Sequence, residues 1–231
     1  MSRPGRWAAL VLGVALATLG LWFIADAGAG KSRATPPAEQ AAPSLADSDP
    51  TDQADVDQAD AARIFLSEVD AQRAYRQGLL PAGVHSILNL DRTMRHGEFH
   101  WNDDGVPPGE LSIRVDIRRQ LVSVFRAGHE IGAAVVLYGA DGKETPLGRF
   151  PVLRKSEDYR SRAYDAPMPY SLWMTNDGVA LHGSSVDQGR ATNGCVGVPL
   201  GFARLLFGAA EVGDVVEVVR SPPENAGAET A

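Results

Sequence analysis

The segment that decides the fold runs from residue 111 to 137 and reads LSIRVDIRRQLVSVFRAGHEIGAAVVL. Its first part alternates apolar and polar side chains, beginning with Leu111 and Ile113, and this period of two is typical of a strand with one buried face. Two more runs of β-branched and apolar residues follow. The turn-forming residues 126–129 separate them, and a second turn stands at 139–142. The segment therefore predicts a β-meander.

The residues that follow the meander predict further strands and one helix. Short apolar or β-branched runs at 148–153, 171–174, 178–181 and 215–219 are typical of strands. Between the last two of these runs, apolar side chains recur at helical spacing over about 199–207. The second half of the chain is therefore predicted to form a mainly β domain that contains one helix.

The N-terminal end has the composition of an exported protein. Two arginines precede an uncharged apolar run at 7–24, and small residues follow it. Residues 1–30 are therefore predicted to be either a cleaved signal peptide or a retained membrane anchor. Residues 31–58 are rich in Ala, Pro, Asp and Gln and are predicted to be a disordered linker. We expect the remainder to be periplasmic or otherwise extracytoplasmic, tethered to the inner membrane or secreted through it.

The rest of the chain divides into three predicted parts. Residues 59–109 form an N-terminal extension, and apolar residues at helical spacing predict a short helix within 59–80. This extension would be a cap, a docking helix or an autoinhibitory segment. Residues 110–220 form the main domain, and residues 221–231 are expected to be a flexible tail.

Charge and cysteine usage narrow the possible functions. The formal net charge is −7, and no basic run interleaved with aromatic residues is present, so a nucleic acid partner is excluded. The chain has one cysteine, Cys195, which in an exported protein has no intramolecular partner and stays a free thiol. It is either a small buried hydrophobic residue or a reactive nucleophile.

The neighbourhood of Cys195 favours the reactive thiol. A thiol needs a base at neutral pH, and His182 stands at the end of a predicted strand, one small-residue connector before the cysteine. Gly194 allows a tight turn, so that the amides of residues 194 and 195 could face a developing oxyanion. A helix starting near Pro199 would place the thiol close to the positive end of a helix dipole, which favours thiolate.

Two short motifs carry a resemblance to a known family. Leu181-His182-Gly183, followed by Thr192-Asn193-Gly194-Cys195-Val196, resembles the signature of the L,D-transpeptidase catalytic domain, the YkuD-like family. The runs 115–121 and 135–150 and the closing Val212-Gly213-Asp214 fit the same layout, so the resemblance covers about 110–220. It implies a β-sandwich with a helix following the catalytic cysteine.

The resemblance also implies roles for individual residues. Cys195 would form a thioester with a donor peptide, and His182 would act first as base and then as acid. The orienting and oxyanion residues would be Gly183, through its carbonyl, Thr192, Asn193 and Gly194. No metal or other cofactor is implied. His96 and His100 are spaced like metal ligands, but the third ligand and the helix that such a site needs are missing.

Two positions depart from the family pattern. Asn193 stands where the family usually has His, and Gly197 stands where it usually has Arg or Asn. A guanidinium at the second position could hold a substrate carboxylate. We therefore expect either that another group, such as Arg190, takes that role or that the donor specificity differs. Tyr170 is a second candidate for substrate contact, the alternative being that it only packs in the core or lid.

These observations predict a cysteine L,D-transpeptidase that acts on peptidoglycan stem peptides of the cell envelope. It would release D-Ala from a tetrapeptide stem and pass the acyl group to an amine, either in a second stem or in an envelope protein. With water as acceptor, the same machinery would be an L,D-carboxypeptidase or endopeptidase. A non-catalytic wall-binding module of the same fold is a third possibility.

Overall fold

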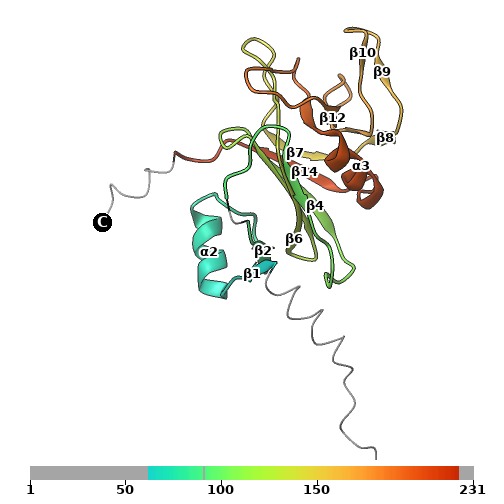
Figure 1. Cartoon of the computed structure of the whole chain (residues 1–231). Helices are drawn as coiled ribbons and strands as arrows, with labels where there is room; N and C mark the ends of the chain where they lie inside the picture. Colours follow the sequence, from blue (N-terminus) through green and yellow to red (C-terminus); the bar gives the residue numbers. More distant parts are fainter. Residues whose placement is uncertain (1–61, 91, 224–231) are drawn as a thin grey trace, which may run out of the picture. The chain divides into compact units, whose positions relative to one another are not determined.

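The computed structural model describes residues 62–90 and 92–223, which Figure 1 draws as coloured ribbons. The predicted signal or anchor at 1–30 and the predicted linker at 31–58 lie outside the described residues, as does the tail beyond residue 223. In the described part, no helix is both long and apolar enough to cross a membrane.

The described residues contain a larger sheet of eight strands, built around the predicted meander. Its strands are β1 (Arg63–Phe65), β2 (Ser86–Leu88), β3 (Phe99–Trp101), β4 (Leu111–Asp116), β5 (Leu121–Arg126), β6 (His129–Val135), β7 (Gly148–Pro151) and β14 (Val215–Val219). The order is β1-β2-β6-β5-β4-β14-β7, and β3 also pairs with β6. Strands β4, β5 and β6 pair antiparallel in sequence order, which confirms the predicted meander.

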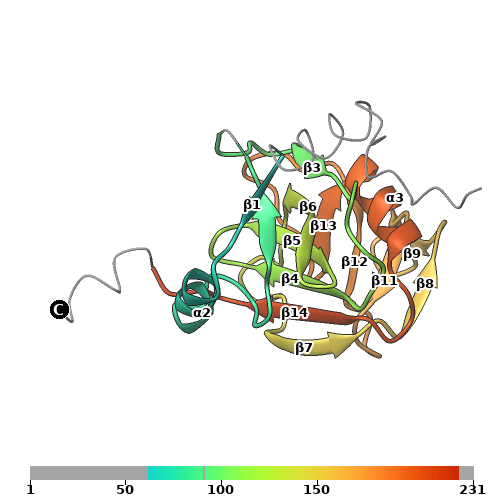
Figure 2. The same cartoon turned by 90° about the horizontal axis from the view of Figure 1, so that it is seen from below.

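A smaller sheet and a helix stand against the larger sheet (Figure 2). The smaller sheet has the order β13-β12-β11-β8. Its strands are β8 (Arg154–Ser156), β11 (Ser171–Trp173), β12 (Ala180–Ser184) and β13 (Val196–Pro199), and a separate hairpin is formed by β9 (Arg160–Ser161) and β10 (Ala166–Pro167). Helix α3 (Leu200–Ala209) follows β13 directly. The predictions of a mainly β domain and of a helix after Cys195 are confirmed.

The core lies between the two sheets and α3. Leu111, Ile113 and Val115 on β4 are 5%, 1% and 0% exposed, whereas Ser112 between them is half-buried, so the period of two does separate a buried from an outer face. Helix α3 contributes Phe202, which is fully buried in the same cluster. The fold is a β-sandwich closed on one side by this helix.

Strands of the N-terminal extension belong to the larger sheet. Strand β3 pairs antiparallel with β6, and the rings of Phe99 and Trp101 pack edge-on against Phe202 of α3, with centroids 6.0 and 5.6 Å apart. A Cβ added at Gly132 of β6 would lie 2.5 Å from the Trp101 ring, so the missing side chain makes room for it. The extension is therefore part of the sandwich.

The predicted helix of the extension is present but buries less than its sequence indicates. Helix α2 (Glu68–Arg76) begins at Ser67, whose hydroxyl accepts a hydrogen bond from the Asp70 amide at 3.1 Å. None of its residues is buried, and Val69 is 65% exposed. Ile64 is not helical at all, because it pairs through its backbone with β2. The apolar spacing there combines a strand and a helix, so the short helix predicted within 59–80 covers only Glu68–Arg76.

A buried arginine ties β1 to the rest of the sheet. Arg63 is 7% exposed, and its guanidinium donates to the Glu130 carbonyl at 2.6 Å and to the Asn102 carbonyl. The Glu130 carboxylate accepts from the Leu88 amide at 2.9 Å. Burial raises the pKa of Glu130, and the nearby charge of Arg63 acts in the opposite direction. The two residues therefore depend on each other for compensation of buried charge.

Replacing Arg63 with alanine is expected to lower the free energy of unfolding by about 3 kcal/mol, because two carbonyl bonds are lost and Glu130 loses its compensating charge. Urea unfolding of the two proteins measures the difference. Arg73→Ala is the matched control, since the ion pair of Arg73 with Asp70 is exposed and contributes only about 0.3 kcal/mol. Equal stability of the two variants would show that Arg63 does not join the extension to the sheet.

Candidate active site

The pairing of β12 with β13 brings His182 and Cys195 to one face of the smaller sheet. The two strands run parallel, with His182 directly opposite Gly197, so Cys195, two residues before Gly197, is level with Ala180. Side chains two residues apart on a strand share a face. Ala180 and Cys195 also meet in one apolar cluster. His182 on β12 and Cys195, the residue immediately before β13, are therefore diagonal neighbours, with no side chain opposite the histidine.

The imidazole of His182 is held by the backbone of the next residue. It is 8% exposed, and its Nδ1 lies 2.9 Å from the carbonyl oxygen of Gly183. A carbonyl can only accept, so this bond puts the proton on Nδ1 and leaves the Nε2 lone pair free. Burial lowers the pKa of His182 below its ordinary value near 6.5, although the bond to Gly183 opposes the shift. The ring is therefore neutral at pH 7.

The thiol of Cys195 is turned toward the residues before β12. Its Sγ lies 3.8 Å from the carbonyl oxygen of Gly178, a direction opposite to that of His182 along the strand. Burial raises the pKa of Cys195 above its ordinary value near 9, while a hydrogen bond from the Ala180 backbone lowers it. The resting state is a neutral thiol beside a neutral imidazole, without a preformed ion pair.

The expectation that the dipole of the following helix would favour thiolate was wrong. Helix α3 begins at Leu200, and the four residues of β13 separate it from Cys195. At about 3.3 Å per strand residue, this places the thiol more than about 13 Å from the helix along the chain. The dipole acts only over the first turn, so it does not lower the pKa of the thiol.

Two threonine hydroxyls fix the backbone of the cysteine loop. Thr192 Oγ1 donates to the Cys195 carbonyl at 2.5 Å, and Thr145 Oγ1 lies 3.5 Å from the same oxygen. Thr145 is 6% exposed and also accepts from the Gly139 amide at 2.9 Å. Thr192 was among the predicted residues, whereas Thr145 was not. The signal for it was its place at the head of the family-like run at 145–150.

Gly194 has a backbone conformation that a residue with a side chain could adopt only with strain. Its φ is +102°, in the region that favours glycine. A Cβ there would come within 3.7 Å of the Lys143 and Glu144 carbonyl oxygens, which is ordinary contact. The demand for glycine therefore comes from the backbone angle rather than from a lack of space.

A Gly194→Ala variant is expected to be acylated by a β-lactam about 10²-fold more slowly, because backbone strain would displace the amides of residues 194 and 195 from the developing oxyanion. Stopped-flow or mass measurements give the rate. Gly189→Ala is the matched control: its φ is +77° and a Cβ there would meet nothing within 4 Å, so it carries the strain without touching the cysteine. Equal losses in both variants would argue against a specific role for Gly194.

A pocket of about 480 Å³ opens at Cys195. Asn193 and Gly194 line it beside the thiol, and most of the facing wall comes from residues 159–179. Two aromatic residues stabilise that wall, since the rings of Tyr159 and Trp173 meet edge-on at 4.9 Å. The lining residues are Lys143, Glu144, Tyr159, Ser161, Arg162, Ala163, Tyr164, Met168, Trp173, Asp177, Gly178, Val179, Asn193, Gly194 and Cys195.

Two of the predicted substrate contacts lie outside this pocket. Tyr170 packs edge-on against Phe207 of α3, with ring centroids 5.7 Å apart. Arg190 pairs with Asp187 at 3.2 Å, and its side chain is 62% exposed. Neither residue is part of the pocket lining. Among the residues that the structure describes, no group of His, Cys, Asp and Glu gathers in a way that could hold a metal ion.

Gly197 lies close to Leu137 and Ser184. Its amide and carbonyl both pair with Leu137, at 2.9 and 2.8 Å. A Cβ at this position would lie 3.1 Å from Cβ of Ser184, which is a tight contact, and 3.5 Å from Cβ of Leu137, which is ordinary contact. A side chain at residue 197 would therefore require Ser184 to shift by a few tenths of an ångström.

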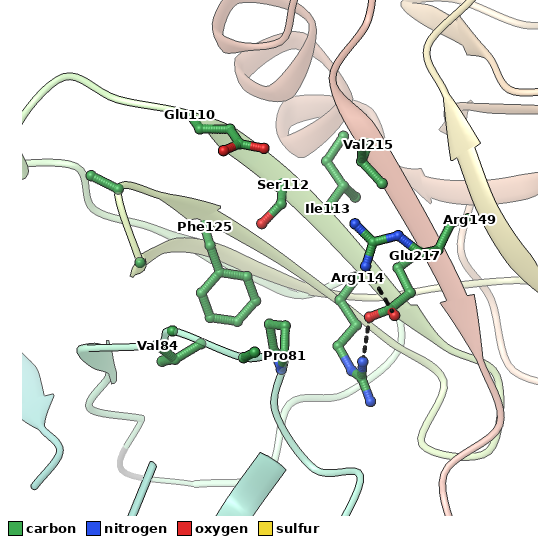
Figure 3. A pocket seen from close by; sticks show the side chains of 14 residues that line it. Pro81, Val84, Glu110, Ser112, Ile113, Arg114, Phe125, Arg149, Val215 and Glu217 are labelled. Carbon is green, nitrogen blue, oxygen red and sulfur yellow. Dashed lines mark hydrogen bonds and ion pairs between the residues drawn. The ribbon is translucent and has the colours of Figure 1, made fainter. Parts of the chain in front are cut away.

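A second pocket, of about 410 Å³, contains none of the predicted site residues (Figure 3). Glu217 of β14 is directly opposite Arg114 of β4 and Arg149 of β7, and its carboxylate lies 2.5 and 3.6 Å from their guanidinium groups. Opposite charges paired across strands stabilise the register of a sheet. We therefore assign this cluster to the sheet and not to a reaction.

Comparisons with known proteins point to one family. Residues 110–218 match the L,D-transpeptidase catalytic domain, YkuD. The solved structures that resemble this chain include an L,D-transpeptidase from Stackebrandtia nassauensis, with 24% identity, 52% of this chain and 61% of that chain covered, and a TM-score of 0.46. L,D-transpeptidase 1 from Mycobacterium tuberculosis has 25% identity, coverage of 47% and 60%, and a TM-score of 0.42.

The L,D-transpeptidase from Enterococcus faecium has 25% identity, coverage of 48% and 50%, and a TM-score of 0.44. In each of these pairs the matched region spans at most 61% of the solved chain. No curated protein matches this chain.

Proposed function

Residues 110–218 belong to the L,D-transpeptidase catalytic domain family, and from this premise we propose that the chain is a cysteine acyltransferase acting on peptidoglycan stem peptides. Cys195 is the nucleophile and His182 the base. The observation that carries the proposal is the fixed imidazole: its Nδ1 is bound to Gly183, and it lies on the same sheet face as the only cysteine of the chain.

In the first step, rotation about the Cα–Cβ bond turns the sulfur of Cys195 from Gly178 toward Nε2 of His182. The thiol proton moves to Nε2 as the sulfur attacks the carbonyl of the diamino acid at position three of a tetrapeptide stem. The new oxyanion is stabilised by the amides of Gly194 and Cys195. Because both groups are neutral at rest, proton transfer accompanies attack instead of preceding it.

In the second step, the carbon–nitrogen bond breaks and His182 returns the proton to the leaving amine of D-Ala. The product on the enzyme is a thioester of Cys195. An acceptor amine then loses a proton to His182 and attacks the thioester, which forms a new amide and restores the thiol. Thr145 and Thr192 support both steps, since they hold the Cys195 backbone whose amide serves the oxyanion.

The absence of a side chain at Gly197 supports one alternative form of the same chemistry. Without the Arg or Asn usual at that position, the site offers no group there for a peptide carboxylate, and water can take the place of the amine. The enzyme would then be an L,D-carboxypeptidase or endopeptidase. Peptidoglycan as substrate requires an extracytoplasmic location, and the sequence of residues 1–30 supports export with tethering to the inner membrane.

The test has two parts: acylation of Cys195 by a carbapenem, and the dependence of D-Ala release on an added amine acceptor. Intact mass of the wild-type protein after incubation with a carbapenem should show one drug adduct, and proteolytic mapping should place it on the peptide that contains Cys195. D-Ala release from a tetrapeptide donor is then measured with and without an added amine. Formation of an amide product with the added amine supports a transpeptidase. D-Ala release at the same rate with and without the amine, and without amide product, supports the hydrolase. A folded protein with neither adduct nor release would favour a wall-binding module.

A further inference from the structure

The pocket at Cys195 is lined by two cations, Lys143 and Arg162, and two carboxylates, Glu144 and Asp177. Arg162 lies in the turn between β9 and β10 and is exposed. In the described part of the chain it makes no ion pair, whereas its neighbour Arg160 pairs with Asp165 at 2.7 Å. The hairpin therefore ties down one arginine and leaves the other free at the pocket.

Two other charged groups of the pocket lining, Lys143 and Glu144, make hydrogen bonds to uncharged groups. Lys143 Nζ donates to the hydroxyl of Tyr164 at 2.9 Å and lies 5.0 Å from the centre of that ring. Its hydrogen-bond partner is neutral, and in the described residues Lys143 makes no ion pair. The Glu144 carboxylate accepts from the Gly142 amide at 2.9 Å, which directs it to its own loop. Positive charge thus faces the pocket from the hairpin and from the 139–147 loop, while the carboxylate of Asp177 lines it from the turn before β12.

Neither residue 197 nor residue 190 can bind a carboxylate in this pocket. Gly197 has no side chain that could bind a carboxylate, and Arg190 is paired with Asp187 outside the pocket. We propose that Arg162, assisted by Lys143, binds a carboxylate of the donor peptide, a contact that a guanidinium at position 197 could otherwise make. This inference rests on the proposed function, because it names the substrate group that the same pocket recognises.

A guanidinium can hold a carboxylate through two parallel hydrogen bonds, which a lysine cannot reproduce. The donor has two candidate groups: the terminal carboxylate of D-Ala, and a side-chain carboxylate of the diamino acid where it carries one. Both present the same chemistry to Arg162. The contact exists in the ground state and the transition state alike, so its loss raises KM and leaves kcat unchanged.

The experiment measures kcat and KM for release of the C-terminal residue, as D-Ala or, from the C-terminal amide, as D-alaninamide, by the wild type, Arg162→Gln, Arg162→Lys and Arg190→Gln. Three donors are compared: the free tetrapeptide acid, its C-terminal amide, and the peptide with the diamino acid side-chain carboxylate amidated. Arg190→Gln is the matched control, since it removes the same charge from an exposed arginine outside the pocket. Arg162→Gln should raise KM about 10-fold for the free acid, and Arg162→Lys should restore part of the loss.

The amidated donors identify the carboxylate. The donor whose amidation removes the carboxylate that Arg162 binds should have a wild-type KM as high as that of Arg162→Gln with the free acid. With that donor, Arg162→Gln should not raise KM further. Unchanged KM in Arg162→Gln, or an equal rise in Arg190→Gln, would overturn the inference and leave the proposed function standing. A folded wild type that releases neither D-Ala nor D-alaninamide from any donor would overturn both.

Discussion

A Cys195→Ala variant is expected to release D-Ala at least about 10⁴-fold more slowly than the wild type and to form no carbapenem adduct, because the thioester has no other atom on which to form. The sequence contains no second cysteine that could substitute. Coupled assay of D-Ala and intact mass measure the two effects on the same protein sample.

The control for this variant is its fold. Cys195 is half-buried, and the carbonyl that Thr192 and Thr145 bind belongs to its backbone, so alanine keeps both contacts. Its melting temperature should therefore stay within a few degrees of the wild type, because only the sulfur atom is removed. D-Ala release that survives in a folded Cys195→Ala protein would show that the thiol is not the nucleophile.

A His182→Gln variant is expected to be acylated by the donor about 10³-fold more slowly at pH 7, since a general base typically contributes 10²- to 10⁴-fold. Glutamine preserves much of the volume beside Gly183 but cannot take the thiol proton. His96→Gln is the matched control, because it makes the same substitution at a histidine of the N-terminal extension, outside β12 and the cysteine loop. Acylation rates of the two variants are compared by mass at fixed times.

The pH dependence separates the loss of a base from a loss of structure. The pKa of His182 is lowered, so the wild-type rate should rise with pH below 6.5 and be level by neutral pH. The pKa of Cys195 is raised above 9. Without the base, the variant depends on thiolate, and its rate should still be climbing at pH 9. A His182→Gln profile that stays parallel to the wild type would contradict the assignment.

Sequence patterns predicted the parts of the fold that depend on local periodicity. The alternation that starts at Leu111 depends on burial of one strand face, and it located β4 correctly. The helix after Cys195 was also predicted within two residues at its end. The predicted pair of His182, on β12, and Cys195, immediately before β13, lies close together, because the small residues between them allow the chain to return.

The features that were missed depend on contacts between distant segments. Strand β13 has only four residues, which give too short a pattern to separate from the start of a helix, and the dipole expectation failed for that reason. Tyr170 and Arg190 were named from their position in the chain, but only the pocket shows which cations reach the site. Arg162 had no sequence signal, because its importance comes from the absence of a partner for it in the described fold.

Strand β3 and its neighbours have a practical consequence for the isolated domain. A protein cut at residue 110, where the family match begins, would lose the strands that pair with β6 and the rings that cover Phe202. The bare edge of β6 would then expose a row of unpaired amides and carbonyls, which invites association between molecules. For soluble expression, the protein should therefore begin before Arg63, even though all the residues proposed to take part in the reaction follow residue 110.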